Sequence, residues 1–203
     1  MRPSNAEIVR HHDDEPPAGV NPFLPGHAQT PYTVRIEEYD HEWPLLFTEA
    51  EDKIRGALGE RVLELHHVGS TAVPGLPAKP FIDVDLVVAD PAAEASYIPD
   101  LEAAGFHHRI REPWWHEHRL LVQPEPRVTL HVFGPDCPEV IRHLMFRDWL
   151  IEHADERERY AAAKRAAATA TNAEGGHGMD YNAHKQAVVH EIYERMFRAH
   201  GLL

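Results

Sequence analysis

The sequence predicts an α+β fold, in which a mixed β-sheet has helices packed on one side and is followed by a C-terminal helical segment. Apolar residues repeat at helical spacing over about 41–58, and Gly59 supplies a stop signal. Short stretches of alternating polarity follow between 61 and 133, as expected for strands. From Pro138 onward the pattern becomes helical again.

The individual elements follow from these patterns in chain order. Strands are expected near 61–68, 80–88, 106–111, 119–123 and 127–133, and helices near 92–104, 138–153, 154–170 and 180–199. The glycine-rich break at 174–178 follows no strand, so a flexible hinge is favoured over a second phosphate loop. Residues 1–31 are rich in Pro, acidic residues and His without periodicity, which predicts an extended N-terminal arm before a folded domain over 32–203.

The stretch 66–86 contains the strongest functional signal. Gly69 and Ser70 follow one expected strand, and a glycine there lets backbone N–H groups approach an anion while a following hydroxyl can donate to phosphate oxygens. The next strand contains Asp83 and Asp85. These side chains project to the same face, about 6.6 Å apart at their Cα atoms. The opposite face is apolar, with Ile82, Val84, Leu86 and Val88.

Two carboxylates placed in this way predict a site for a hard cation. Mg²⁺ prefers oxygen ligands and is usually held by one or two carboxylates together with substrate phosphates, so Asp83 and Asp85 are expected to bind Mg²⁺ or Mn²⁺. Without a cation or a basic neighbour the two charges would repel each other. Lys79, four residues before Asp83, is a candidate for that basic neighbour. The alternative is that Gly-Ser and Pro-Gly only turn the chain and that the aspartates are solvated.

The segment HHVGSTAVPGLPAKPFIDVDLVV resembles the GrpB family, within the nucleotidyltransferase superfamily typified by polymerase β. The likeness extends over about 33–198 and includes the motifs YDHEWP at 39–44, LHV at 130–132, HLMFRDWL at 143–150 and YNAHK at 181–185. It implies a nucleotidyltransferase-like sheet, but no established substrate. It also favours Arg147 and Lys185 as phosphate-binding residues.

His131 departs from the pattern of the wider superfamily, whose active members generally have a third carboxylate on a neighbouring strand. Val128, Leu130 and Val132 alternate onto one face of the expected strand, which leaves Thr129 and His131 on the other. His131 is therefore a candidate third metal ligand or proton acceptor. Imidazole is a softer ligand than Mg²⁺ prefers and would suit manganese or zinc better. A histidine hydrogen-bonded inside the sheet is the alternative interpretation.

The remaining candidates are polar residues expected around the phosphates. His67 and Thr71 flank the Gly-Ser turn, and Lys164 could add positive charge if the C-terminal helices close over the sheet. An ordinary solvated helix face is the competing interpretation. The candidate nucleotide- and phosphate-binding set is Gly69, Ser70, Thr71, Lys79, His67, Arg147 and Lys185.

Composition limits the classes of partner. The 203 residues have a net charge of −13, which argues against binding of long nucleic acid through phosphate neutralisation and favours a small nucleotide that brings its own metal.

No apolar run is long enough for a membrane span and the N-terminal residues lack the apolar core of a secretory signal, so a cytoplasmic location is expected. Cys137 is the single cysteine, and the 17 histidines lack zinc-motif spacing.

These observations support three hypotheses of different classes. The leading one is a metal-dependent enzyme that transfers a nucleotidyl group from a nucleoside triphosphate to an unidentified small acceptor, with Asp83, Asp85 and His131 as catalytic residues. The second is a non-catalytic protein that binds a nucleotide or phosphometabolite and has an incomplete acidic triad. The third is an interaction module that recruits a partner through its acidic surface and its N-terminal arm.

Overall fold

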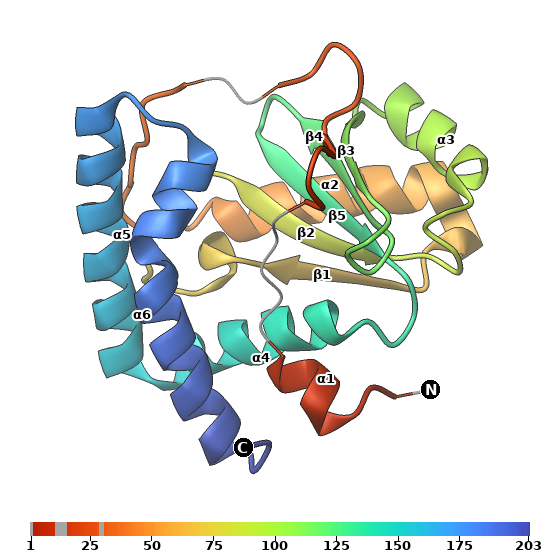
Figure 1. Ribbon diagram of the computed structural model, residues 1–203. Coiled ribbons are helices and arrows are strands. Elements are labelled where there is room, and N and C mark those ends of the chain that lie inside the picture. Colours follow the sequence, from red (N-terminus) through yellow and green to blue (C-terminus); the bar gives the residue numbers. More distant parts are fainter. Residues whose placement is uncertain (1, 11–15, 29–30) are drawn as a thin grey trace.

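The protein is built around one five-stranded sheet, seen in a computed structural model that describes residues 2–10, 16–28 and 31–203 (Figure 1). The strands lie in the order β1-β2-β5-β4-β3. Their bounds are β1 (Glu64–Val68), β2 (Ile82–Val87), β3 (His107–Glu112), β4 (His118–Gln123) and β5 (Val128–Phe133). The central pair β2 and β5 is parallel and the other neighbouring pairs are antiparallel. The predicted mixed sheet is therefore confirmed.

One face of the sheet is covered by α2 (Trp43–Leu58) and α3 (Ile98–Ala103). Helix α2 begins with Pro44 in its first turn and ends at Gly59, whose positive φ of 57° stops it as predicted. The expected helix over 92–104 is shorter than predicted, because its first part forms a 3₁₀ turn (Glu94–Ser96). The side chains that form the core under these helices include Ile54, Leu58, Ile82, Val84, Leu86, Leu101, Val128, Leu130 and Val132.

The predicted C-terminal helical segment consists of α4 (Pro138–Glu152), α5 (Ala154–Glu174) and α6 (Gly178–Ala199). Helix α4 lies against the other face of the sheet, where Val140 packs with Val87 and Phe133. Helices α5 and α6 form an antiparallel hairpin at the end of the sheet where β1 ends and β2 begins (Figure 1). The sheet face that contains the two aspartates is thus bordered by helices from the last third of the chain.

The segment between α5 and α6 forms a tight turn between helices. Gly175 adopts the left-handed conformation with φ of 64° and ends α5, which is a common use of glycine. His177 caps α6, and the Asp180 carboxylate accepts a hydrogen bond from the His177 backbone N–H at 2.8 Å. The segment thus connects α5 to α6 and follows no strand, in agreement with its position in the sequence.

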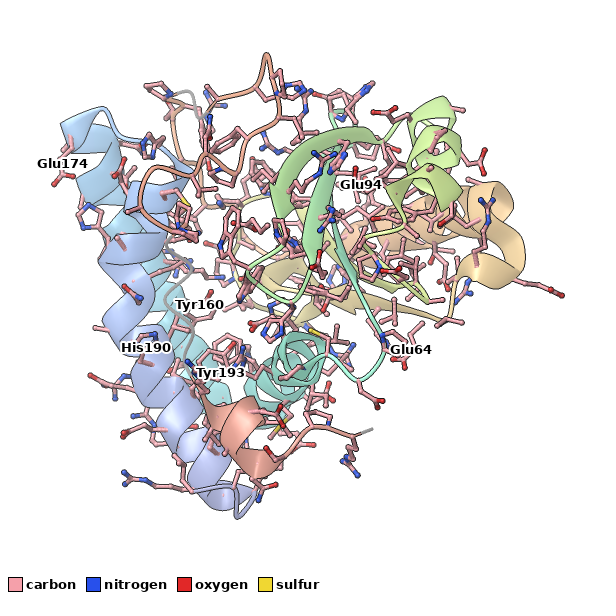
Figure 2. All side chains as sticks on the ribbon, turned by 45° about the vertical axis from the view of Figure 1, so that its right-hand side comes forward. Glu64, Glu94, Tyr160, Glu174, His190 and Tyr193 are labelled. Atoms are coloured by element: carbon pink, nitrogen blue, oxygen red, sulfur yellow. The ribbon has the colours of Figure 1, made fainter. Side chains whose placement is uncertain are left out.

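The loop between β1 and β2 is anchored to the helical hairpin. Val73 and Leu76 are fully buried in a cluster with Leu150, Tyr160 and Ile192, which belong to α4, α5 and α6. Figure 2 labels Tyr160 on α5 between the hairpin and the sheet. This packing fixes the Gly-Ser turn and Lys79 relative to the C-terminal helices.

The N-terminal segment contacts the domain at two places. Residues Asn5–Val9 form helix α1 where an extended arm was expected, because the Ser4 hydroxyl and the Glu7 carboxylate cap the helix reciprocally. Ile8 is buried in a cluster with Phe197. Further along, the Leu24 backbone N–H donates to the carbonyl of Arg109 on β3. Residues 1, 11–15 and 29–30 of this segment lie outside the described part of the chain.

None of the helices in the described ranges combines the length and the apolar character needed to cross a lipid bilayer.

Candidate functional site

Asp83 and Asp85 lie on the sheet face beneath α4, with a different environment for each. Asp83 pairs in register with Thr129 on β5, and Asp85 pairs with His131. The Asp85 side chain is fully buried (0 % exposed), whereas Asp83 is only partly buried. The two carboxylates share a face as predicted, but only Asp83 lies near the surface. Asp85 lines the interior under α4.

Gly69 lies directly against the carboxylate of Asp83. Its φ of +69° is in the left-handed region, and a Cβ at this position would meet the Oδ2 of Asp83 and stand 3.0 Å from its Cβ and Cγ. Val68, the preceding residue, pairs in register with Asp83. Glycine is therefore required both by the backbone conformation and by the close approach of the carboxylate. Ser70 begins the following 3₁₀ turn (Ser70–Ala72), so the predicted Gly-Ser turn and Asp83 are brought together.

His67 and Thr71 form an internal brace beneath this turn. The fully buried Thr71 hydroxyl donates to the Phe81 carbonyl at 3.1 Å, so the Nε2 of His67, also 3.1 Å away, must donate to that hydroxyl. The His67 ring stacks on Phe47 at 4.7 Å. Burial and the charge of Arg147 lower the pKa of His67 to about 4, so it is neutral at physiological pH.

Arg147 approaches the same turn from α4. Its Nη1 donates to the carbonyl of His67 at 3.1 Å, and its Nε donates to Asp148 at 2.8 Å. The structure therefore places three predicted phosphate-binding residues, His67, Thr71 and Arg147, in contacts that hold the turn in place.

Asp85 is paired with His143, a residue that the sequence analysis did not assign to the site. The Nδ1 of His143 on α4 lies 2.8 Å from the Oδ2 of Asp85, and its Nε2 lies 3.4 Å from Glu139. Burial disfavours the charge on His143, but Asp85 and Glu139 outweigh it and raise the pKa of His143 to about 9. Asp85 thus has an imidazolium partner at neutral pH.

His131, which is partly buried, is paired with the buried His118. Its Nδ1 lies 3.1 Å from the Nε2 of His118 on β4, and the Nδ1 of His118 lies 2.7 Å from Glu112. Burial, together with His118, lowers the pKa of His131 to about 3. His131 lies on the same face as Thr129, as predicted, and it is neutral and hydrogen-bonded inside the sheet.

The pKa of Asp83 is also shifted from its ordinary value. Burial raises the pKa of Asp83 to about 6, against the opposing effects of Lys79, His143 and a hydrogen bond with Thr129. An added cation beside this carboxylate would favour its ionised form.

The carboxylates of Asp83 and Asp85 are the candidate metal ligands of this site. His131 is paired with His118 and does not join them. The described residues contain no group of three or more His, Cys, Asp or Glu side chains placed to hold a metal ion. The Oδ1 of Asp85, however, is buried without a hydrogen-bond partner in the described structure. That oxygen and Asp83 suit Mg²⁺, which keeps several waters and takes further ligands from substrate phosphates.

Basic residues gather on the side of Asp83 that faces α5 and α6. Lys79 lies 4.6 Å from the centre of the Tyr181 ring, and Lys185 lies 5.3 Å from the same ring. Lys164 on α5 is buried, and its Nζ lies 4.7 Å from the centre of the Tyr160 ring. The expectation that the C-terminal helices add positive charge near the sheet agrees with this arrangement.

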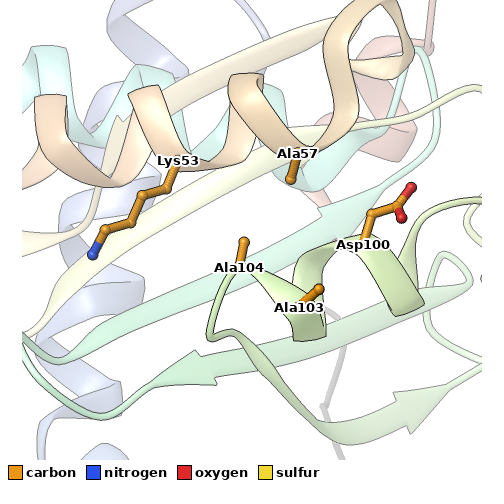
Figure 3. Close-up of a pocket in the computed structure, with 5 residues that line it drawn as sticks. All are labelled: Lys53, Ala57, Asp100, Ala103 and Ala104. Atoms are coloured by element: carbon orange, nitrogen blue, oxygen red, sulfur yellow. The ribbon is translucent and has the colours of Figure 1, made fainter.

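A separate depression lies on the opposite face of the molecule. It has a volume of about 420 Å³, lies between α2 and α3, and is lined by Lys53, Ala57, Asp100, Ala103 and Ala104 (Figure 3). Lys53 and Asp100 are its polar side chains, and three alanines make up the rest of its lining. This depression is remote from the aspartates and is not part of the candidate site.

The protein belongs to the class of α+β proteins in which a mixed sheet has a Gly-Ser turn beside a strand with an Asp-x-Asp motif. Residues 33–195 match the family described as GrpB protein, and the chain belongs to this GrpB family. A UPF0157 protein of Halalkalibacterium halodurans is 40% identical over 195 residues, covering 96% of each chain. A UPF0157 protein of Streptomyces coelicolor is 40% identical over 133 residues, 66% of this chain and 69% of its own.

Among solved structures, the conserved protein GrpB from Enterococcus faecalis aligns with a TM-score of 0.71 and 26% identity, covering 82% of this chain and 99% of its own. The family prediction and the predicted fold class are thus confirmed. A structure of Cid1 in complex with the UTP analog UMPNPP aligns over 64% of this chain with a TM-score of 0.40 and 14% identity, which is too distant to bear on function.

The chain also matches part of a longer protein with a different name. A dephospho-CoA kinase of Mycolicibacterium paratuberculosis is 30% identical over 161 residues, which are 66% of this chain but only 39% of the kinase. The kinase name belongs to that longer protein and assigns no activity to this chain.

Sequence reasoning missed His143 and the tyrosine rings around the lysines. A signal for His143 was present, since Glu139, His143 and Arg147 recur at four-residue spacing and so share one face of a helix. The same four-residue spacing joins Tyr160 to Lys164 and Tyr181 to Lys185, so each tyrosine shares a helix face with a lysine.

Proposed function

We propose that the protein binds a nucleoside triphosphate with a divalent cation beside Gly69 and Asp83, and transfers its nucleotidyl group to a small acceptor. The observation that carries the proposal is the close approach of Gly69 to the Asp83 carboxylate. This contact places the backbone of a glycine turn, which suits an anion, next to an oxygen that suits a cation. A phosphate that binds together with its metal ion needs N–H donors for the phosphate and a carboxylate for the metal at the same place.

In the proposed reaction an acceptor hydroxyl attacks the α-phosphorus of the triphosphate. A new oxygen–phosphorus bond forms, the bond to the oxygen that bridges the α- and β-phosphates breaks, and pyrophosphate leaves with that oxygen. The hydroxyl proton passes to a nearby base or to water. The residues act chiefly by positioning the reactants and balancing charge, as is usual for transfer of phosphoryl groups.

Each residue of the site has a separate role in this proposal. Asp83 and the unpaired Oδ1 of Asp85 would hold Mg²⁺ or Mn²⁺, which would supply charge neutralisation at the phosphates. Gly69 and Ser70 would donate to phosphate oxygens. Lys79 and Lys185 would offset the remaining negative charge. Because His131 is paired with His118, it would support the position of Asp85's strand and would not contact the reactants.

Replacement of Asp83 tests the proposal directly. Asp83→Asn keeps the shape of the side chain and removes its charge, so we expect binding of ATP with Mg²⁺ to disappear in titration calorimetry while the fold is retained. Asp52→Asn is the matched control, because Asp52 is exposed on α2, on the other side of the sheet. An unchanged ATP affinity in Asp83→Asn, in a folded protein, would contradict the proposal.

A second function is favoured by the pairing of Asp85. His143 already neutralises this carboxylate, and His131 is neutral, so the site lacks the three acidic residues expected of an active enzyme. In this alternative the protein binds a nucleotide or phosphometabolite without turnover. Pyrophosphate release from each nucleoside triphosphate, tested with Mg²⁺ or Mn²⁺ and a broad pool of acceptors, distinguishes the two. Release that depends on Asp83 and Asp85 supports the enzyme, and binding without release supports the alternative.

A further inference from the structure

Three lysines from three different parts of the chain converge beside Asp83. Lys79 precedes β2, Lys164 lies on α5 and Lys185 lies on α6. Their ammonium groups are arranged around two tyrosine rings. Lys79 and Lys185 lie 4.6 and 5.3 Å from the centre of the Tyr181 ring, and Lys164 and Lys185 lie 4.7 and 5.8 Å from that of Tyr160. The rings lie beside the three amines, and none of the amines makes a direct ion pair in the described structure.

Lys164 is the most unusual member of this lysine cluster. Its side chain is buried (1 % exposed), and its Nζ has no hydrogen-bond partner in the described structure. An unpaired buried amine is costly, and such a group is retained mainly where a ligand completes it. Aromatic faces stabilise a cation only in part. An acceptor from outside the chain would complete the hydrogen bonding of Lys164.

This acceptor must be an anion. Lys79 and Lys185 approach the same position, so a second cation there would be repelled, and a neutral ligand would leave the cluster uncompensated. Lysine is a compact point charge suited to phosphate oxygens. Asp83 lies close enough to interact electrostatically with Lys164, so the cluster adjoins the proposed metal position.

We propose that Lys79, Lys164 and Lys185 bind the terminal phosphates of a polyphosphate ligand, and that Lys164 takes up a proton when the anion binds. This inference rests on the proposed function and deepens it, because it names the groups that hold the end of the phosphate chain farthest from the reacting phosphorus. It also gives Lys164 a role of its own, which is to take up a proton when the ligand binds. The amine is stored in its neutral form and becomes charged only with the ligand in place.

The surroundings of Lys164 explain this proton uptake. Burial, followed by the charges of Lys185, Arg165 and Lys79, lowers its pKa to about 6, and Asp83 opposes that shift. The groups that face it are Lys185 on α6, Lys79 before β2, Asp83 on β2, and Tyr160 and Arg165 on α5 itself. A bound phosphate would favour the charged amine, so binding near pH 7.5 would draw a proton from the buffer.

Titration calorimetry with inorganic tripolyphosphate tests this inference without a nucleoside. The full chain is titrated at pH 7.5 in the presence of a chelator, in two buffers that differ in their enthalpy of ionisation. We expect binding whose measured heat differs between the buffers, because protons move from buffer to protein. Lys164→Met keeps the length of the side chain and removes the amine. We expect it to take up fewer protons on binding than the unaltered chain and to weaken binding by about 10- to 100-fold, the range for loss of one charged hydrogen bond.

Lys53→Met is the matched control, because it removes the same charge from α2 on the opposite face and should leave both quantities unchanged. The same number of protons exchanged by the unaltered chain and by Lys164→Met would overturn the proton uptake, because protons lost by the ligand itself contribute to both. Unchanged tripolyphosphate affinity in Lys164→Met would overturn the site. If ATP with Mg²⁺ still binds in an Asp83-dependent way in either case, the inference fails and the proposed function stands. If tripolyphosphate binds in a Lys164-dependent way but no nucleotide binds, the anion site stands and the proposed function fails.

Discussion

The imidazole of His143 on α4 lies 2.8 Å from the fully buried carboxylate of Asp85 on β2. This pair joins the C-terminal helical segment to β2, one strand of the central parallel pair. Glu139, one turn earlier on α4, lies on the other side of the ring, with its oxygen 3.4 Å from Nε2. His143 is thus held between two acidic groups, and it provides the positive charge that makes a buried Asp85 tolerable.

Removal of His143 should therefore destabilise the protein strongly. His143→Ala leaves the Asp85 carboxylate buried without its partner, and loss of one member of a buried ion pair typically costs about 3–5 kcal/mol. The free energy of unfolding, measured in urea at pH 7, should fall by about that amount. His107→Ala is the control, because His107 is exposed on β3 and should change stability little. Equal stabilities for the two variants would show that the pair contributes nothing.

The contribution of His143 should also depend on pH. Its pKa is raised in the folded protein to about 9, from an ordinary value of 6.5. The folded state therefore binds more protons between these values, and the stabilisation is fully present below pH 6.5 and lost as pH rises through 9. We expect the difference in unfolding free energy between the unaltered chain and His143→Ala to shrink across this range. A difference that stays constant from pH 6 to pH 9.5 would contradict the assignment of the proton to His143.

Gly69→Ala should damage the site as well as the fold. The positive φ alone destabilises an alanine at this position by about 1 kcal/mol, and the added Cβ would in addition meet the carboxylate of Asp83. Gly75→Ala is a closely matched control, since Gly75 has a φ of +76° but nothing within 4 Å of its Cβ position. Thermal unfolding should show a larger loss for Gly69→Ala, and only this variant should lose ATP affinity. Equal effects of the two variants would mean that the contact with Asp83 is unimportant.

Much of this fold could be predicted because its elements have regular local patterns. The helix predicted over 41–58 is found at Trp43–Leu58, and the strand predicted over 127–133 is found at Val128–Phe133. The alternation that places Val128, Leu130 and Val132 in the core and Thr129 and His131 on the other face is also found. Such patterns depend only on neighbours in the chain, so one sequence contains them.

The partners of the site residues could not be predicted in the same way. Whether Asp85 lines an open cleft or is buried depends on how α4 packs, and His143 is 58 residues away in sequence. Lys79, Lys164 and Lys185 lie on separate elements and converge only when the α5–α6 hairpin docks beside the loop before β2. Periodicity shows which face a residue occupies, but it does not show which element covers that face.

Lys164→Met should make the protein more stable. The unpaired amine of Lys164 destabilises the folded state, and its replacement by an apolar side chain of similar length should raise the unfolding free energy by about 1–3 kcal/mol. The pKa of Lys164 is lowered in the folded state to about 6 from 10.5, so the unfolded state binds more protons between these values. The cost is therefore largest below pH 6 and falls as pH rises toward 10.5.

Urea unfolding at several pH values checks this expectation. The gain in Lys164→Met over the unaltered chain should be greatest near pH 6 and should diminish toward pH 10. This trend opposes the one expected for His143, so the two variants must be compared separately with the unaltered chain. Lys53→Met should show no such gain. A loss of stability in Lys164→Met at pH 6 would indicate that the lysine has a stabilising partner in the protein.

His131→Asp tests whether the site lacks only a third carboxylate. The introduced carboxylate would lie in register with Asp85 on the neighbouring strand, so the two acidic groups would repel each other without a cation. His131→Asn has nearly the same shape without the charge, and both variants lose the contact with His118. We expect the Asp variant to be less stable than the Asn variant by about 1–3 kcal/mol in chelator, because the position is partly buried and the added carboxylate repels Asp85. Mg²⁺ or Mn²⁺ should then raise the melting temperature of the Asp variant more than that of the Asn variant, because a ligand that binds only the folded state stabilises it by mass action. If the metal shifts both variants equally, the carboxylates on β2 do not form a metal site that an acidic residue on β5 can complete.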